Sequence, residues 1–231
     1  MSIFECRSLT KYYGKTKALD NIDLKLEAGQ IVGLLGPNGS GKTTMIKLAN
    51  GLLQPAGGQI LIEGEEPGPG TKAKVAYLPD RGFLPEYMTV EALFKLYGDF
   101  FKDFNIKKAD QMLDGLGIKK TDTLKKMSKG TKEKIQLILV MSRDAKIYFL
   151  DEPIAGVDPA ARDYILRTII SNYCENSLVL ISTHLIADVE SVLDDVVFIK
   201  EGRVVLHKAA DIIREEEGKN IDGLFREVFK C

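Results

Sequence analysis

The sequence has little cysteine, and the few cysteines it has stand far apart. Cys6, Cys174 and Cys231 are the only three in 231 residues. An odd number at wide, unrelated spacings supports neither a disulfide framework nor a cysteine-ligated metal site. This usage is typical of a protein in a reducing cytosol.

Long apolar runs and an excess of one charge are missing as well. No stretch approaches the roughly 18 apolar residues of a membrane-spanning helix, so we expect the chain itself not to cross a membrane. The opening MSIFECRSLTKYYGK lacks the apolar centre of a signal peptide, which predicts that there is none. The net charge of −1 excludes a global cationic field of the kind that drives non-specific binding to nucleic acid.

What the sequence does contain is an alternation of strand-like and helical segments. Its 45% hydrophobic and 28% charged residues are those of an ordinary soluble globular protein. The patterns predict strands within 2–10, 18–29, 30–36, 57–62, 74–78, 146–153, 177–183, 194–200 and 203–207. They predict helices within 39–53, 89–101, 106–118, 128–143, 159–173, 185–192 and 220–231, the last with Leu224, Phe225, Val228 and Phe229 on one side. Such an alternation favours a mainly parallel, helix-covered sheet with an inserted helical subdomain.

One glycine-rich segment carries a phosphate-binding pattern. GPNGSGKTT, residues 36–44, fits G-x-x-x-x-G-K-[ST] and lies between an apolar strand and a helix. Glycines let the backbone N–H groups turn inward around phosphates, and the helix N-terminus adds its dipole. Lys42 is placed to reach the β- and γ-phosphates, and the Thr43 hydroxyl to bind Mg²⁺. The segment therefore predicts a nucleotide site.

Two carboxylates and a histidine follow later strands. Asp151 and Glu152 end the run IYFLDEP, and His184 follows LVLIST. Parallel strands deliver their C-terminal ends to the ligand edge of the sheet, so these three side chains are expected near the phosphate loop. Asp151 then suits Mg²⁺, held through water, and Glu152 suits a base that takes a proton from water.

A lysine-rich segment, LKKMSKGTKEK at 124–134, has three interpretations. It is a solvated surface where a helix starts, a nucleic-acid patch, or a phosphate-binding element built on Ser128 and Gly130. A serine hydroxyl and free backbone N–H groups at a helix N-terminus suit an anion. The low net charge argues against the nucleic-acid patch.

Together these motifs, in this order, resemble an ATP-binding cassette (ABC) ATPase, the nucleotide-binding subunit of an ABC transporter. The resemblance covers residues 3 to about 207. It implies ATP and Mg²⁺, with Tyr13 stacking on adenine, Glu152 and His184 as catalytic residues beside Lys42, and AGVDP (155–159) as the D-loop. The phosphates would be held by Gly36, Pro37, Asn38, Gly39, Ser40, Gly41, Lys42, Thr43 and Thr44.

Two positions depart from the family pattern. The family signature LSGGQ reads Met127-Ser128-Lys129-Gly130-Thr131 here, and the resemblance implies that Ser128 and Gly130 bind the γ-phosphate of ATP on a second subunit. Lys129 either adds charge near that phosphate or points into solvent. Asp80 stands where the family usually has glutamine. The resemblance implies that Asp80 contributes to the Mg²⁺ site together with Thr43 and Asp151. Slower ATP hydrolysis than in glutamine-bearing relatives is a hypothesis.

The resemblance also implies an architecture: an α/β P-loop NTPase core with an antiparallel β-subdomain and an inserted helical subdomain. We expect one domain over 1–231, with a catalytic core at about 1–84 and 143–207, a helical subdomain at about 85–142 and a helical tail at about 208–231. The implied partners are a second nucleotide-binding subunit, identical or not, and a separate membrane permease. The permease would contact Phe83, Leu84, Tyr87 and Met88 and hold the protein at the cytoplasmic face of the membrane, with no nucleic acid involved.

Other functions stay open at this point. A soluble ABC ATPase acting on ribosomes or nucleic acid is the first alternative, although it usually has two cassettes or a long coiled-coil insert. A P-loop small-molecule kinase is the second, but it leaves the signature, the D-loop and His184 unexplained. The short chain and its segment DEPIAGVDP resemble those of nucleotide-binding subunits of bacterial exporters with a separate permease. The cargo does not follow from the sequence.

Overall fold

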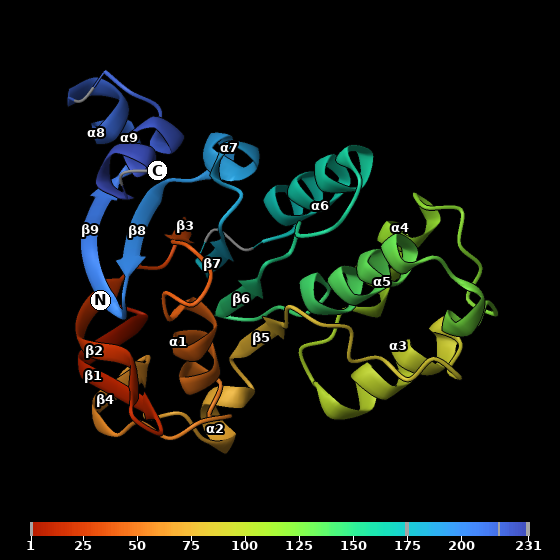
Figure 1. Cartoon of the computed structure of the whole chain (residues 1–231). Helices are drawn as coiled ribbons and strands as arrows, with labels where there is room; N and C mark the ends of the chain where they lie inside the picture. The colour runs from red at the N-terminus through yellow and green to blue at the C-terminus, as the bar shows by residue number, and fades with distance from the viewer. Residues whose placement is uncertain (1, 174–175, 217, 230–231) are drawn as a thin grey trace.

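The computed structural model describes residues 2–173, 176–216 and 218–229. Its two sheets lie side by side, with one group of helices projecting away from them (Figure 1). Cys6 is buried and has a free thiol. Cys174 and Cys231 lie outside the described residues.

The larger sheet has six strands in the order β5-β6-β7-β3-β8-β9. All neighbouring pairs run parallel except the last, in which β9 runs antiparallel to β8. The sheet is therefore mainly parallel, as predicted, and it gathers the C-terminal ends of β3, β6 and β7 at one edge. The strands are β3 (Gln30–Leu35), β5 (Val75–Leu78), β6 (Ile147–Asp151), β7 (Leu178–Thr183), β8 (Asp195–Lys200) and β9 (Arg203–Ala209).

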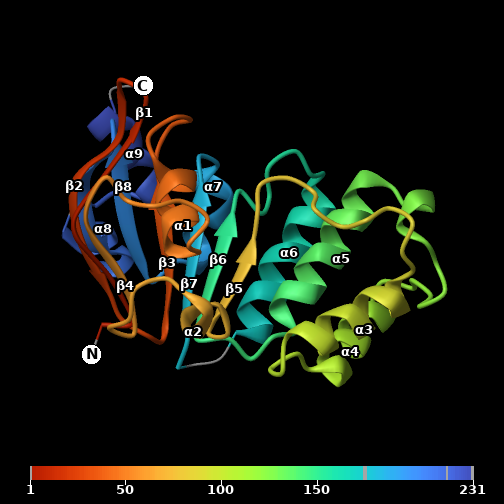
Figure 2. The ribbon, with the colours of Figure 1, turned by 90° about the horizontal axis from the view of Figure 1, so that it is seen from below.

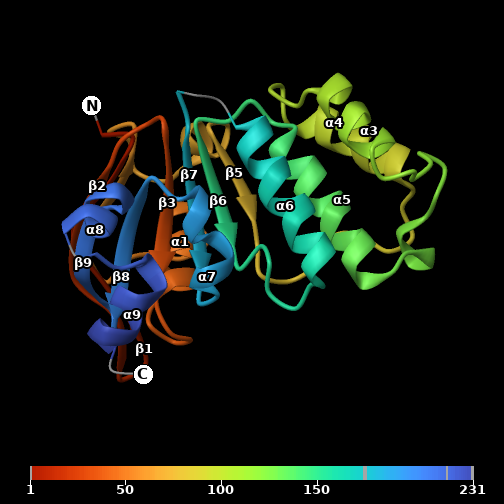
Figure 3. The same ribbon diagram turned by 90° about the horizontal axis from the view of Figure 1, so that it is seen from above.

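Both faces of this sheet are buried, which explains its almost continuous apolar strands. In β3, Ile31 and Leu35 pack into one hydrophobic cluster, while Val32 and Leu34 pack into another on the opposite face. The first cluster includes residues from the helices α6 (Pro159–Asn172), α7 (Ile186–Val189), α8 (Ala210–Glu216) and α9 (Ile221–Phe229), which lie over that face (Figure 3). A 3₁₀ turn, η2 (Glu190–Val192), follows α7.

The smaller sheet is antiparallel, in the order β2-β1-β4. It consists of β1 (Phe4–Tyr13), β2 (Thr16–Leu26) and β4 (Gly57–Ile62). Its inner face shares the second hydrophobic cluster with helix α1 (Lys42–Ala49) and with the larger sheet. This arrangement encloses α1 between the two sheets (Figure 2).

The helical group has a small hydrophobic core of its own. It contains α3 (Val90–Phe100), α4 (Ile106–Asp114), the 3₁₀ turn η1 (Leu124–Lys126) and α5 (Lys129–Met141). Each α-helix begins at a capping side chain: Thr89, Asn105 and Ser128 accept N–H bonds from Ala92, Lys108 and Thr131. The apolar faces of the three helices then meet in one cluster.

The structure adds detail that the sequence patterns missed. The glycine- and proline-rich stretch after β4, predicted as a turn, contains the short helix α2 (Pro69–Lys72). The C-terminal helix α9 does pack its predicted side inward. The ring centroids of Phe225 and Phe229 are stacked 4.1 Å apart, and both rings lie against Phe198 of β8. Among the described residues, no helix has the length and apolar character needed to cross a membrane.

Arg143 joins the helical group to the edge of the large sheet. Its buried guanidinium donates to the carbonyl oxygens of Ala73 and Val75, at 2.9 and 2.6 Å, on the β5 side. The same group holds the Asp103 carboxylate, between α3 and α4, with N–O distances of 2.9–3.2 Å. The guanidinium also lies over the ring of Phe101, 3.9 Å from its centroid. This side chain thus adds polar contacts between the helical group and the sheet edge, beside the apolar contacts that Leu137, Val140 and Met141 of α5 make with the core of the large sheet.

We expect Arg143→Met to lower the free energy of unfolding by about 3 kcal/mol, because Asp103 and two carbonyl groups lose their partner. Urea denaturation without nucleotide measures this change. Arg226→Met is the control, since Arg226 pairs with Asp222 on the surface of α9 and its loss should cost under about 1 kcal/mol. Equal effects of the two substitutions would show that Arg143 is not a structural tie.

Candidate active site

The loop between β3 and α1 is shaped by close contacts that only glycine permits. A Cβ atom on Gly36 would overlap the carbonyl oxygen of Ile199 in β8 and lie 2.7 Å from the Ser40 hydroxyl. Gly41 has φ +113°, and a Cβ there would lie 2.6 Å from the carbonyl oxygen of Ala18. The loop is therefore pressed against β8 and the start of β2, and its backbone can take its conformation only with these glycines.

Lys42 is the buried charge at the centre of this loop. Its side chain is 6% exposed, and its ammonium donates to the carbonyl oxygens of Gly36 and Pro37 at 2.7 and 3.1 Å. Burial lowers the pKa of Lys42, while the negative charges of Glu152 and Asp151 act in the opposite direction. The loop thus surrounds a cation with oxygen atoms, a position suited to meeting a phosphate.

Asp151 lies fully buried at the end of β6. Its Oδ1 accepts hydrogen bonds from the hydroxyls of Thr43, at 3.1 Å, and Ser182. Its Oδ2 is buried and has no hydrogen-bond partner within the described part of the chain, and burial raises the pKa of the carboxyl group against the effect of the two hydroxyls. A buried carboxylate oxygen without a partner, beside a threonine hydroxyl, fits an oxygen-binding cation such as Mg²⁺.

Glu152 is held in an unusual conformation at the same edge. Its φ of +50° lies in the left-handed region, which is uncommon for a residue other than glycine, and its backbone N–H donates to Ser182 O at 2.9 Å. Its carboxylate accepts from the Thr183 hydroxyl at 3.1 Å, lies 3.0 Å from His184 Nδ1, and is 3.7 Å from Lys42 Nζ. Thr183 and His184 come from the end of β7, next to β6 in the sheet. The expected neighbourhood of Glu152 and His184 is therefore present as a direct contact.

Lys42, Thr43 and Glu152 border an open cleft of about 370 Å³, a volume in the range of small-molecule sites, whereas Asp151 and His184 do not line it. Tyr13, 49% exposed, stands at one side of it, and Asp80 and Glu152 stand at another. The remaining lining residues are Thr16, Lys17, Ala18, Asn38, Gly39, Gly41, Lys42, Thr43 and Thr44. Of the expected phosphate-binding side chains, Ser40 is buried and does not line the cleft, and its hydroxyl has no partner in the described ranges of the chain.

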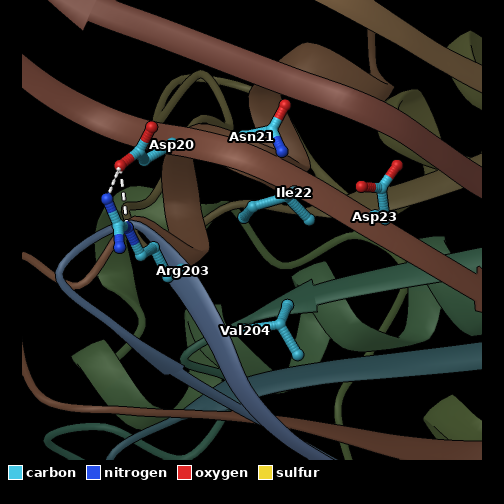
Figure 4. A pocket seen from close by; sticks show the side chains of 6 residues that line it. All are labelled: Asp20, Asn21, Ile22, Asp23, Arg203 and Val204. Atoms are coloured by element: carbon cyan, nitrogen blue, oxygen red, sulfur yellow. Dashed lines mark hydrogen bonds and ion pairs between the residues drawn. The ribbon is translucent and has the colours of Figure 1, made fainter.

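The turn between β8 and β9 supports the loop from behind. The N–H of Gly202 donates to Ser40 O at 2.9 Å, and its carbonyl accepts from Asp20 N–H at 2.8 Å. A second hollow, of about 460 Å³, lies beside this turn, where the Asp20 carboxylate meets Arg203 (Figure 4). The Asp20–Arg203 ion pair at this hollow joins the smaller sheet to β9 of the larger one, and Asp20 also pairs with Lys17 of its own strand.

The signature segment lies apart from the residues that line the cleft. Ser128 caps α5, accepting from Thr131 N–H at 3.1 Å, and remains exposed. Lys129 is paired with Glu133 at 3.7 Å, and its ammonium would lie 3.4 Å from a Cβ on Gly156. Gly130 faces the D-loop as well, since a Cβ there would lie 3.9 Å from Asp158 Oδ2.

Most of the neighbouring lysines are engaged within the chain. Lys120 pairs with Asp110 at 2.8 Å, Lys132 pairs with Glu86, and Lys134 lies over the ring of Tyr164. Pairing of this kind is typical of a solvated, mixed-charge surface. It does not favour a nucleic-acid patch.

The four apolar residues expected to meet a permease divide into two groups. Leu84 and Met88 pack against the core of the helical group. Phe83 lines an open groove of about 630 Å³ with Tyr97 and Phe101, and Tyr87 is 81% exposed. Phe83 and Tyr87 are therefore the two whose side chains are available on the surface.

Sequence reasoning missed two hydroxyls that hold the carboxylates. Ser182 and Thr183 are the last residues of LVLIST, and they reach Asp151 and Glu152 because β7 lies next to β6. The polar end of an otherwise apolar strand was the available signal. The sequence did not reveal which strand stood beside it.

The strand, loop and helix of β3, residues 36–41 and α1, with buried Lys42 and Asp151, define a P-loop nucleotide-binding domain. Comparison with known proteins identifies the family of P-loop proteins to which the chain belongs. Residues 19–155 match the family model described as ABC transporter. The chain belongs to this ABC transporter family, as an ATP-binding protein with the family's ATPase domain.

Individual relatives agree. An uncharacterised ABC transporter ATP-binding protein of Methanocaldococcus jannaschii is 34% identical, over 90% of this chain and 78% of its own. The SkfA peptide export ATP-binding protein of Bacillus subtilis is 29% identical, over 89% of this chain and 88% of its own. A solved ATP-binding subunit of an ABC transporter has a TM-score of 0.88 at 28% identity, over 99% of this chain and 100% of its own. The chain spans 61% of the length of two cyanobacterial relatives, from Nostoc and Synechocystis.

We expect Gly36→Ala to destabilise the protein by about 1–3 kcal/mol, because the added methyl group overlaps the Ile199 carbonyl and the loop must move. Thermal unfolding without nucleotide measures the change, and ATP affinity should fall with it. Gly39→Ala has open space around its Cβ but needs φ +82°, so it separates the cost of the left-handed backbone from the cost of the overlap. An unchanged melting temperature for Gly36→Ala would contradict the close approach.

Proposed function

We propose that this chain binds and hydrolyses ATP as the energy-supplying subunit of a membrane transporter. The observation that supports this best is the position of Glu152, whose carboxylate is held by Thr183, His184 and Lys42 at the border of the P-loop cleft. A fixed carboxylate beside a phosphate-binding loop is what activation of a water molecule requires.

In this proposal the loop 36–44 surrounds the phosphates and Tyr13 stacks on the adenine ring. The backbone N–H groups and the start of α1 favour the phosphate anions. Lys42 exchanges its contacts with the Gly36 and Pro37 carbonyl groups for the β- and γ-phosphates. Because the ammonium is already buried and oriented, little reorganisation accompanies this exchange.

Thr43 and Asp151 are the residues proposed to hold Mg²⁺, with Asp80 nearby at the cleft. The free Oδ2 of Asp151 and the adjoining Thr43 hydroxyl support this assignment. No group of three or more His, Cys, Asp or Glu side chains forms a metal cage among the described residues, which suits a cation that takes its other ligands from phosphate and water. When bound, Mg²⁺ neutralises charge that develops on the phosphates.

Glu152 then orients a water molecule and accepts its proton as the water oxygen bonds to the γ-phosphorus and the bond from that phosphorus to the bridging oxygen breaks, which releases ADP. His184 uses Nδ1 for Glu152, which leaves Nε2 for the γ-phosphate. The Thr183 hydroxyl keeps the carboxylate in place through this step. Positioning and electrostatic stabilisation supply most of the rate enhancement.

The working form in this proposal is a head-to-tail dimer with a copy of the chain or a related subunit. Ser128 and Gly130 of one subunit contact the γ-phosphate held by the other, and the exposure of Ser128 at the start of α5 supports this role. The division into a core (about 1–84 and 143–207), a helical subdomain (about 85–142) and a tail (about 208–231) belongs to the same proposal. The separate hydrophobic cluster of the helical group supports it.

The membrane partner in this proposal is a separate permease that docks at the groove beside Phe83. Phe83 is exposed there, half-buried Tyr97 and Phe101 also line the groove, and aromatic side chains at a surface are typical of protein interfaces. Docking there places the chain at the cytoplasmic face of the membrane. Export is the favoured direction, because one relative is named for peptide export.

We expect Glu152→Gln to slow ATP hydrolysis by roughly 10²–10⁴-fold while ATP still binds, since the amide keeps the shape of the side chain but does not accept the proton. Steady-state phosphate release and equilibrium binding of ATP measure the two effects. Glu91→Gln, at an exposed position on α3, is the control and should hydrolyse ATP normally. Near-normal turnover by Glu152→Gln would remove Glu152 from the proposed role.

We expect Ser128→Arg to abolish ATP-dependent dimerisation and leave nucleotide binding by the monomer intact, because the longer cation occupies the place of the partner's phosphate. Size-exclusion chromatography with and without ATP, in the Glu152→Gln background, measures this effect. Ser128→Thr preserves a hydroxyl and the helix cap, so it should still dimerise. Dimers of Ser128→Arg in ATP would contradict the proposed role of the signature.

A further inference from the structure

The loop Pro79–Phe83 stands at the meeting point of three cavities. Asp80 lines the nucleotide cleft and also the groove that contains Phe83. With Arg81, Gly82 and Glu152 it also lines a small third cavity, of about 40 Å³. A displacement of this loop therefore changes the nucleotide cleft and the groove together.

Few interactions hold this loop. In the described part of the chain, residues 80–84 take part in no backbone–backbone hydrogen bond, because the loop lies beyond the last pair of the β5–β6 ladder. Asp80 and Arg81 contact each other at 3.9 Å, which adds nothing that fixes the loop to the rest of the fold. A loop whose backbone makes no hydrogen bonds to neighbouring backbone depends on side chains for its position.

Gln136 supplies such a side chain. It is 6% exposed and stands in an otherwise apolar part of α5, next to Ile135 and Leu137. Its Oε1 accepts the N–H of Phe83 at 3.2 Å. Oε1 and Nε2 would both lie 3.9 Å from a Cβ on Gly82, so the amide rests against that glycine at van der Waals distance.

A buried glutamine costs free energy unless its polar atoms are bonded, and a leucine here would continue the apolar face without that cost. The polar side chain at this position is therefore explained by the bond it makes to the loop. Glu133, one turn earlier on α5, lines the same small cavity, and its Oε2 has no hydrogen-bond partner among the described residues. This side of α5 is thus polar where it meets the loop and apolar elsewhere.

We propose that Gln136 is a positioning residue that fastens the loop Pro79–Phe83 to α5, and so sets the place of Asp80 at the nucleotide cleft. The link between Asp80 and the metal rests on the proposed function, whereas the fastening itself does not. A single hydrogen bond of this kind shifts the equilibrium between a loop fastened to α5 and a loop released from it by roughly two- to tenfold. That is enough to alter how often Asp80 faces the cleft and Phe83 faces the groove.

Amide hydrogen exchange tests the fastening directly, with the whole chain and without nucleotide. In the unaltered protein, the Phe83 amide should exchange more slowly than those of Arg81 and Gly82, which have no acceptor among the residues that the structure describes. Gln136→Leu should accelerate exchange at Phe83 by roughly two- to tenfold, and Gln136→Glu, which keeps an acceptor oxygen, should restore protection. Ile135→Val loosens the core of α5 without touching the loop, so it should leave the Phe83 amide protected.

Equal exchange at Phe83, Arg81 and Gly82 in the unaltered protein would overturn the proposal, even if Gln136→Leu did not fold. Equal acceleration at Phe83 by Gln136→Leu and Ile135→Val would overturn it too, because the effect would then be general loosening.

A second measurement tests the consequence for Asp80. The Mg²⁺ concentration that gives half-maximal ATP hydrolysis should rise by roughly two- to tenfold in Gln136→Leu, and Gln136→Glu should reverse the rise. In an Asp80→Ala background the same substitution should add little, because both residues act through one loop. Additive effects would overturn the connection to Asp80. If the unaltered protein did not hydrolyse ATP, the proposed function would fail, and amide exchange would still decide the role of Gln136.

Discussion

The burial of one positive charge, the ammonium of Lys42, is the constraint on which the rest of the site depends. An ammonium taken out of water is stable only where oxygen atoms replace its hydration, and here the carbonyls of Gly36 and Pro37 and the carboxylate of Glu152 surround it. Those oxygens come together because the loop is pressed against β8 without side chains at Gly36 and Gly41. The carboxylates can then lie close to the charge, at the end of β6, which is separated from β3 by β7. A phosphate entering the cleft meets groups already oriented for it, as expected of an ATP-binding protein of the ABC transporter family.

The fold joins the nucleotide site to a helical group that has a hydrophobic cluster of its own. The two sheets share a continuous core around α1, whereas the helical group packs around its own cluster and adds Leu137, Val140 and Met141 of α5 to the core of the large sheet. Polar links also join these parts: the Arg143 guanidinium, which binds carbonyl groups beside β5 and the Asp103 carboxylate, and the loop Pro79–Phe83 with Gln136. Such links bury little apolar area of their own, so they can rearrange at lower cost than packed apolar contacts. This division suits a protein in which an event at the nucleotide is passed to another surface.

The structure shows which groups surround Lys129 and Asp80, the two residues that depart from the family pattern. Lys129, in place of a small residue in the signature, is not simply directed into solvent: it pairs with Glu133 and lies against Gly156 of the D-loop. Its positive charge is thus partly balanced by the Glu133 carboxylate of the same chain. Asp80, in place of glutamine, stands at the cleft on a loop that is held mainly by one glutamine of α5. Both substitutions lie where the two parts of the fold meet, and neither disturbs the packing of the sheets.

The sequence by itself determined the chemistry and the class. The pattern of residues 36–44 between a strand and a helix, and the carboxylates within IYFLDEP, identified a nucleotide site, because phosphate binding requires glycines and a lysine at fixed spacing along one short segment. The alternation of strands and helices likewise predicted a mainly parallel sheet. Only the tertiary structure decided which strands are neighbours, and with it that Ser182 and Thr183 hold Asp151 and Glu152, that His184 contacts Glu152, and that Gln136 reaches the loop of Asp80. These contacts join residues 31 to 53 positions apart, and no local pattern encodes them, because strand order and helix packing are set by the burial of the whole core.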